Sequence, residues 1–308
     1  MKKLTLLLVA FAGLLGSCSD KRSTSDSLKE YIQVYEAISY YNDAALDPFN
    51  VAYRFHLYRE GGATQALKNE LLPYATIFES VDGQTDTLRF TEALTKPFND
   101  YARVGEIIIH TYGNSLSDEN AVWQVTASSK DSDVWYYVYL EDFGYWNLAI
   151  DKNEYTISNE GKDRFRVQAD AIYMSSLSTG AVWNWDLDLI VARTQGSGSS
   201  LANSRFEVTP NGVPASGGVL NSTTSARWRY EIIDPVLYST DCSYPVKSGG
   251  KERIVRMDMK DYKGLDSVVM DMGQNYGTCH PGFSLSVRTE EDDKWTTHNY
   301  APGGIWIQ

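Results

Sequence analysis

Two stretches decide the fold class of this chain: RFRVQADAIY at residues 164–173 and WNWDLDLIV at residues 183–191. In each stretch apolar residues alternate with polar or charged ones, which is the spacing of a β-strand with one solvated and one buried face. Similar runs recur at intervals of roughly 8–15 residues, with Gly, Ser and Asn between them, as in antiparallel β proteins. We expect further strands around residues 88–90, 104–112, 122–125, 134–140, 148–150, 206–208, 226–233, 254–259, 267–270 and 283–287.

The pattern as a whole predicts a mainly β fold of antiparallel sheets, arranged as a sandwich or as stacked β units. Strands do not alternate with helices, so a parallel nucleotide-binding sheet is disfavoured. Segments 88–112 and 254–287 look like a degenerate repeat, which favours stacked units. The Gly/Ser-rich segment that begins at Gln195 divides the expected fold into a first β-rich region, 47–195, and a second, 196–308.

One amphipathic helix is expected in front of these strands. Apolar residues from Leu28 to Tyr41 recur at steps of three and four, which gives a single apolar stripe. This spacing predicts an N-terminal helix within residues 28–46.

The next segment allows two interpretations. Apolar residues alternate from Phe49 to Leu57, which is strand spacing, whereas Asp47-Pro48 is typical of a helix start. We favour a strand. Residues 63–72 contain helix-forming residues and predict one short helix that Pro73 ends.

The first residues have the three zones of an export signal. Lys2 and Lys3 precede an apolar run from Leu4 to Leu15, which is too short for the roughly 20 residues of a membrane-spanning helix. Leu15-Gly16-Ser17-Cys18 follows and resembles the bacterial lipoprotein signal, in which the cysteine is acylated and becomes the first mature residue.

This resemblance implies removal of residues 1–17 and attachment of palmitate or similar chains to Cys18, which anchors the protein to a membrane. Residues 18–27 then form a flexible tether rich in Ser, Thr and Asp. Ser19 after the cysteine favours the outer membrane, facing either the periplasm or the exterior.

Charge excludes one class of partner. Lys and Arg number 28 against 40 Asp and Glu, so the net charge is -12. Phosphate binding needs a basic field, and we therefore expect no nucleic-acid partner.

Two cysteines remain after Cys18, at positions 242 and 279. In an exported chain Cys242 and Cys279 predict a disulfide, worth about 4 kcal/mol in the chain-entropy model. The alternative is a reactive thiol at Cys279 beside His280. Adjacent residues on a strand point to opposite faces, so this adjacency is weak support for a Cys–His pair.

Catalytic and metal-binding patterns are missing from the sequence. The four histidines are scattered, and no Gly-x-Ser-x-Gly occurs. Acidic residues cluster at 258–271 and 290–293, but neither cluster has a calcium-loop spacing. We predict no catalytic residue, no metal and no cofactor, although a glycoside hydrolase needs only two suitably spaced carboxylates and stays open as an alternative.

Aromatic residues give one positive indication of a ligand. The chain has 21 Tyr and 8 Trp, and several of them crowd residues 135–146. Sugar rings stack on Trp and Tyr, so an exposed row here would suit a glycan. The other interpretation is that these rings fill the core. The candidate ligand-binding residues are Trp135, Tyr137, Tyr139 and Trp146.

A family resemblance covers most of the chain. Its landmarks are the lipoprotein signal, Leu88-Arg89-Phe90, the strand at 103–109, and the cysteine-containing segments 241–250 and 270–279. This order is similar to that of uncharacterised, β-rich outer-membrane lipoproteins of Bacteroidota, although Gln274-Asn275-Tyr276 interrupts the usual spacing before Gly277.

The resemblance implies a membrane-anchored, non-enzymatic binding or structural module of the cell envelope, whose partner is a glycan or an envelope protein. A glycan-binding accessory of a polysaccharide uptake system is the alternative, and a hydrolase is a third.

Overall fold

The computed structural model describes residues 38, 42–90, 102–127, 136–140, 146–151, 153–176, 182–212, 216–220, 225–240, 246–257, 264–273, 282–289 and 293–300. This part of the chain contains two helices, α3 (Asn42–Glu60) and α4 (Gln65–Leu71), and sixteen strands. The mainly β prediction is therefore confirmed. The strands are β1 (Ala75–Glu79), β2 (Thr85–Phe90), β3 (Ala102–His110), β4 (Val122–Ala127), β5 (Tyr136–Leu140), β6 (Trp146–Asp151), β7 (Asn153–Gly161), β8 (Arg164–Ser176), β9 (Val182–Gln195), β10 (Arg205–Pro210), β11 (Ser216–Leu220), β12 (Ser225–Ser239), β13 (Val246–Arg256), β14 (Leu265–Gly273), β15 (Phe283–Thr289) and β16 (Trp295–Tyr300).

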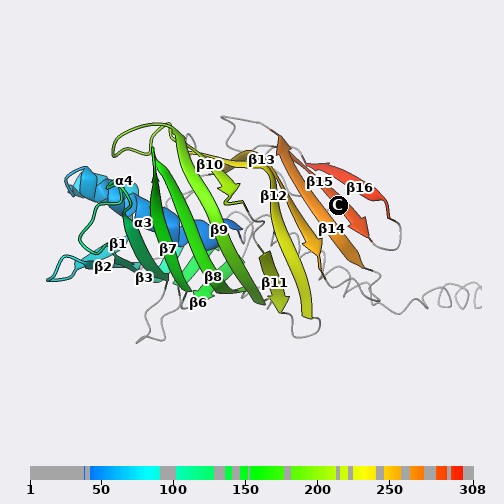
Figure 1. Cartoon of the computed structure of the whole chain (residues 1–308), viewed down its shortest axis with the longest axis horizontal. Coiled ribbons are helices and arrows are strands. Elements are labelled where there is room, and N and C mark those ends of the chain that lie inside the picture. Colours follow the sequence, from blue (N-terminus) through cyan, green and yellow to red (C-terminus); the bar gives the residue numbers. More distant parts are fainter. Residues whose placement is uncertain are drawn as a thin grey trace, which may run out of the picture.

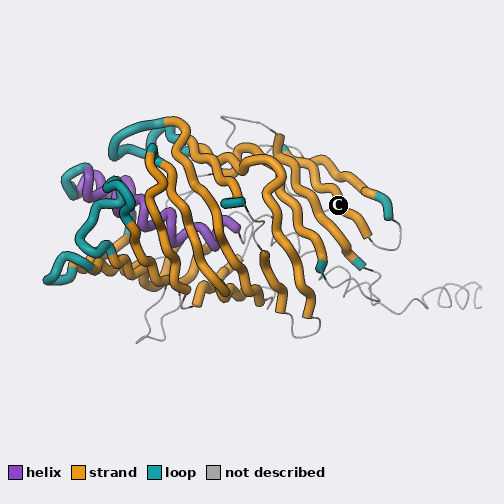
Figure 2. Tube along the Cα trace, in the orientation of Figure 1, coloured by secondary structure: helices purple, strands orange, loops and turns teal. Residues whose placement is uncertain are grey.

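All sixteen strands join one antiparallel sheet, shown as a continuous curved surface in Figures 1 and 2. Each strand pairs with a neighbour that is close in the chain. β4 and β5 pair with different parts of β3, and β6 and β7 pair with different parts of β8. The two strands of each couple therefore share one position in the strand order of the sheet. β10 and β11 share a position between β9 and β12 in the same way. The described strands thus form one sheet, where we expected a sandwich or stacked units.

The expected boundary after Gln195 lies inside this sheet. β9 ends at Gln195, and β10 begins at Arg205 and pairs directly with it. The Gly/Ser-rich residues between them form the connecting loop.

The two sequence stretches that alternate most clearly become the central strands β8 and β9. Phe165 and Val167 of β8 are buried, as are Leu187 and Leu189 of β9. The register shifts between Ala169 and Ile172, so the alternation slips by one residue and Ile172 returns to the buried face.

Helix α3 lies on the buried face of the sheet, with β7, β8 and β9 crossing in front of it in Figure 1. The strand expected over 49–57 is therefore wrong. The error has a physical cause: from Ala45 to Leu57 every residue except Asn50 is buried, so the helix has no wet face to interrupt its apolar pattern. Pro48 lies inside this helix.

The short helix expected over 63–72 is confirmed as α4. Thr64 caps its start, because its Oγ1 accepts a hydrogen bond from the Leu67 N–H at 3.3 Å. The N-terminal helix expected within 28–46 falls mostly outside the described residues, of which only Ile38 and 42–46 belong to it. Among the described residues, no helix is both long and apolar enough to span a membrane.

Candidate functional site

The described part of the chain contains a pocket between α3 and the strands β9, β10 and β12. Its free volume is ≈ 80 Å³, and it is partly open to solvent. Most of its lining is apolar, which is usual for a small-molecule site. The lining residues are Leu46, Asp47, Phe49, Asn50, Tyr53, Val191, Leu201, Phe206, Val208, Tyr238 and Thr240.

Aromatic rings build the helix side of the pocket. Phe49 and Tyr53 are one helical turn apart, and their rings stack with centroids 5.9 Å apart. Tyr53 also meets Phe206 edge to face at 5.7 Å and Phe165 at 5.3 Å. These contacts between helix and sheet leave the rings little freedom, so this wall is preformed.

An ion pair forms the polar end of the pocket. Asp47 accepts two hydrogen bonds from Arg103 on β3, from Nε at 2.8 Å and from Nη2 at 2.6 Å. Both side chains are buried, with 2% and 5% of their surface exposed. Asn50 donates to Asp47 Oδ1 at 3.3 Å and accepts from Arg54 Nε at 3.1 Å. The two polar side chains that α3 presents here are thus engaged with protein partners.

The loop between β9 and β10 closes another side of the pocket with Leu201. Buried Arg193 holds this loop, because its guanidinium donates to the Gly198 carbonyl at 2.9 Å, to the Ser200 carbonyl at 2.5 Å and to Ser204 Oγ at 2.8 Å. Thr240 Oγ1 donates to the Leu201 carbonyl and accepts from the Ser204 N–H at 2.9 Å. The loop is therefore a fixed wall.

Two tyrosines near the pocket have perturbed acidity. Burial raises the pKa of Tyr53, and the Arg193 guanidinium, which donates to its hydroxyl at 3.4 Å, partly opposes that rise. Burial, reinforced by the negative charge of Asp47, raises the pKa of Tyr155 well above its ordinary value. The Tyr155 hydroxyl has no hydrogen-bond partner among the described residues. Both phenols stay neutral at ordinary pH, so neither is suited to act as a base.

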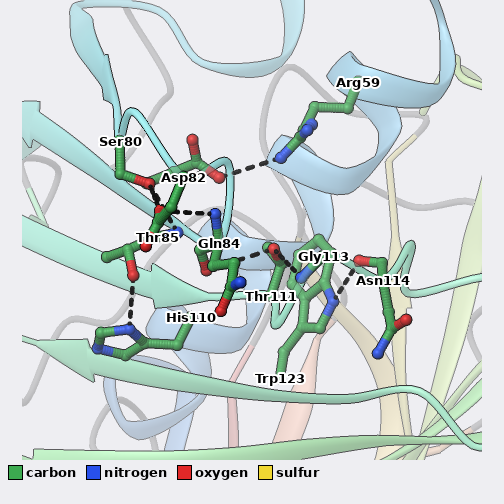
Figure 3. A network of polar contacts seen from close by, with 11 residues as sticks. Arg59, Ser80, Asp82, Gln84, Thr85, His110, Thr111, Gly113, Asn114 and Trp123 are labelled. Carbon is green, nitrogen blue, oxygen red and sulfur yellow. Dashed lines mark hydrogen bonds and ion pairs between the residues drawn. The ribbon is translucent and has the colours of Figure 1, made fainter.

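A second group of polar side chains gathers near the C-terminal end of α3 (Figure 3). Arg59 donates to Asp86 at 3.1 Å, the Gln84 N–H donates to Asp82 at 3.0 Å, and Thr85 Oγ1 lies 3.0 Å from His110 Nδ1. The first contact ties α3 to β2, the second holds the turn between β1 and β2, and the third joins β2 to β3.

The same arrangement continues in the loop after β3 (Figure 3), where the Thr111 hydroxyl accepts from the Gly113 N–H at 3.3 Å and Trp123 Nε1 donates to the Asn114 carbonyl at 3.1 Å. In the part of the chain that the structure describes, no group of three or more His, Cys, Asp or Glu side chains could hold a metal ion. We interpret the cluster in Figure 3 as structural.

Several residues singled out from the sequence lie outside the described ranges: Cys18, Trp135, Cys242 and Cys279. Their lipidation, ligand contact and disulfide stay predictions.

The pairing of β5 gives positions for two of the other aromatic residues. Tyr137 pairs with Val104 of β3, and Tyr139 pairs with Ala102. They lie on either side of Val138, which is the register partner of Arg103.

Trp146, at the start of β6, pairs with Leu140 of β5. The three described aromatic residues of the expected row therefore lie on two neighbouring strands.

Comparison with known proteins adds no relative. No protein-family model, no curated protein and no solved structure matches this chain. The α3 pocket was missed in the sequence because its walls come from segments far apart in the chain. The only signal was an acidic residue, Asp47, at the start of an apolar run.

Proposed function

We propose that this protein is a lipid-anchored, non-enzymatic binding module of the bacterial cell envelope, and that it holds the apolar part of a small ligand in the α3 pocket. The observation that carries the proposal is the pocket itself, which has preformed apolar and aromatic walls. Its one acidic side chain, Asp47, is neutralised by Arg103. A glycoside hydrolase of the usual kind needs two facing carboxylates, so this pocket favours binding over glycoside hydrolysis.

Binding can be tested with a soluble form of the mature chain that lacks Cys18, residues 19–308, and a neutral fluorescent probe such as N-phenyl-1-naphthylamine. We expect saturable binding that Leu201→Trp abolishes, because the larger ring fills the pocket. Val122→Trp is the matched control, since Val122 is 41% exposed on β4 and does not line the pocket. Equal binding by both variants would refute this site.

The anchor is tested separately in cells. We expect a palmitate analogue to label the wild-type protein, and Cys18→Ala to lose the label and leave the membrane fraction. A labelled Cys18→Ala variant, or an unlabelled wild type, would overturn lipidation at this residue.

A second candidate is glycan binding at strands β5 and β6. It is supported by the pairing of Tyr139 with Asn147 and by the alternation of the sequence, which predicts one face for Trp135, Tyr137 and Tyr139 and the other face for Tyr136. A glycan array with the mature chain tests it. We expect any sugar that binds to lose affinity in Tyr137→Ala and Trp135→Ala, while Tyr136→Ala, on the other face, serves as the control. Unchanged affinity in the first two variants would exclude this face.

A further inference from the structure

We infer that the group accepted by the α3 pocket is an uncharged hydrocarbon, alkyl or aryl, no larger than one aromatic ring, and that the Asp47–Arg103 pair imposes this choice. The inference rests on the proposed binding function and specifies its ligand class.

The polar side chains around the pocket already have hydrogen-bond partners in the protein. Both carboxylate oxygens of Asp47 accept from Arg103, and Asn50 is held between Asp47 and Arg54. Thr240 is engaged with the loop between β9 and β10. A polar group of the ligand would give up its hydrogen bonds to water and find these side chains already occupied, which is unfavourable.

The second step concerns charge. A lone buried carboxylate would attract a cation, and a lone buried guanidinium would attract an anion. Asp47 and Arg103 instead form a two-point pair with both side chains at most 5% exposed, so their charges cancel locally. A charged ligand of either sign would then lose its hydration without gaining an opposite charge in the pocket.

The third step is size. An enclosed apolar cavity of about 150 Å³ in an engineered protein binds benzene. The α3 pocket is smaller, at ≈ 80 Å³, but it is partly open to solvent. It therefore suits the end of an alkyl chain or part of a ring, and the remainder of a larger molecule would project outward.

Three ligands of nearly equal shape test this selectivity: toluene, benzoate and benzylammonium. Each competes with the neutral fluorescent probe for the mature wild-type chain. We expect toluene to bind at least about 100-fold more tightly than either ion, because the pocket offers the ions no compensating charge. Affinities within about tenfold of one another would overturn the inference and leave the binding function standing. If the wild-type chain binds neither the probe nor any of the three ligands, the proposed binding function itself is wrong.

A gain of function tests the role of the ion pair. In Arg103→Met the Asp47 carboxylate loses the charge of its arginine partner, and we expect benzylammonium to gain at least about tenfold in affinity while benzoate does not. The double variant Asp47→Asn, Arg103→Met is the control and should bind neither ion. Equal changes for both ions would overturn the assigned role. If circular dichroism shows that Arg103→Met is unfolded, the wild-type ligand series still decides the inference.

Discussion

The Asp47–Arg103 pair makes a strong prediction about stability. Asp47 belongs to α3 and Arg103 to β3, 56 residues apart in the chain, and their side chains are 2% and 5% exposed. Removing one partner leaves the other charge buried without the two charge-assisted hydrogen bonds that join Asp47 and Arg103. For such pairs the cost is about 3–5 kcal/mol, so we expect Arg103→Met to lower the free energy of unfolding by about that amount. This is a large share of the roughly 5–15 kcal/mol by which a typical domain is stable.

The double variant separates charge from packing. Apolar side chains of similar volume usually replace a buried ion pair at little cost. We therefore expect Asp47→Leu combined with Arg103→Met to be within about 1 kcal/mol of the wild type, giving a coupling energy of about 3 kcal/mol or more. Both values come from urea unfolding of the mature chain, followed by far-ultraviolet circular dichroism.

If each single substitution costs less than about 1 kcal/mol, or if the two costs simply add in the double variant, the pair is not a coupled, buried interaction. Equal denaturant slopes for all variants are required before the values are compared, because a changed slope means a changed extent of unfolding.

Three further predictions concern a glycine, a buried histidine and a helix cap. Gly250→Ala should lower the free energy of unfolding by about 3 kcal/mol or more, because φ is +112° and a Cβ would lie 2.5 Å from the Pro235 carbonyl oxygen. Gly62→Ala is the control, with φ of +84° and no atom within 4 Å of the added Cβ, and should cost only about 1 kcal/mol; equal costs would contradict the clash at Gly250. Burial lowers the pKa of His56 below 6.5, so near that pH the unfolded chain binds a proton more readily than the folded chain does. The urea midpoint of unfolding should therefore fall as the pH drops below about 6.5. A His56→Phe variant that shows the same fall would exclude this residue as the cause. Thr64→Ala should cost about 1 kcal/mol in urea unfolding through loss of the α4 cap, with Thr64→Ser close to wild type, and an equal loss in both would argue against the hydroxyl.

Strands were predictable where one face is solvated. The segments 164–173 and 183–191 alternate because their outer residues, such as Arg166 and Asp188, remain partly exposed and pair with each other at 2.8 Å. Strands β1, β7, β11 and β16 were missed. β1 and β16 lie at the edges of the sheet, where little is buried and the alternation is correspondingly weak. β7 lies inside the sheet, but only Tyr155 and Ile157 give it an apolar alternation.

The helix over 42–60 could not be distinguished from a strand by periodicity. Ala52 and His56 lie between the alternating apolar residues, and both are buried, so apolar character no longer reports one face. The candidate site was hidden for a related reason. Its walls come from α3, β9, β10 and β12, and sequence spacing says nothing about contacts over such distances.

The neighbour-to-neighbour pairing of the sheet has a consequence for assembly. Every described strand pairs with strands that lie at most three places away in chain order, so each pairing closes a comparatively short stretch of chain. Such a sheet can gain or lose a hairpin at either edge while the order of its inner strands stays the same. We therefore expect related chains to vary in length near β1 and β16, and to keep the length of α3 and of the strands that it packs against.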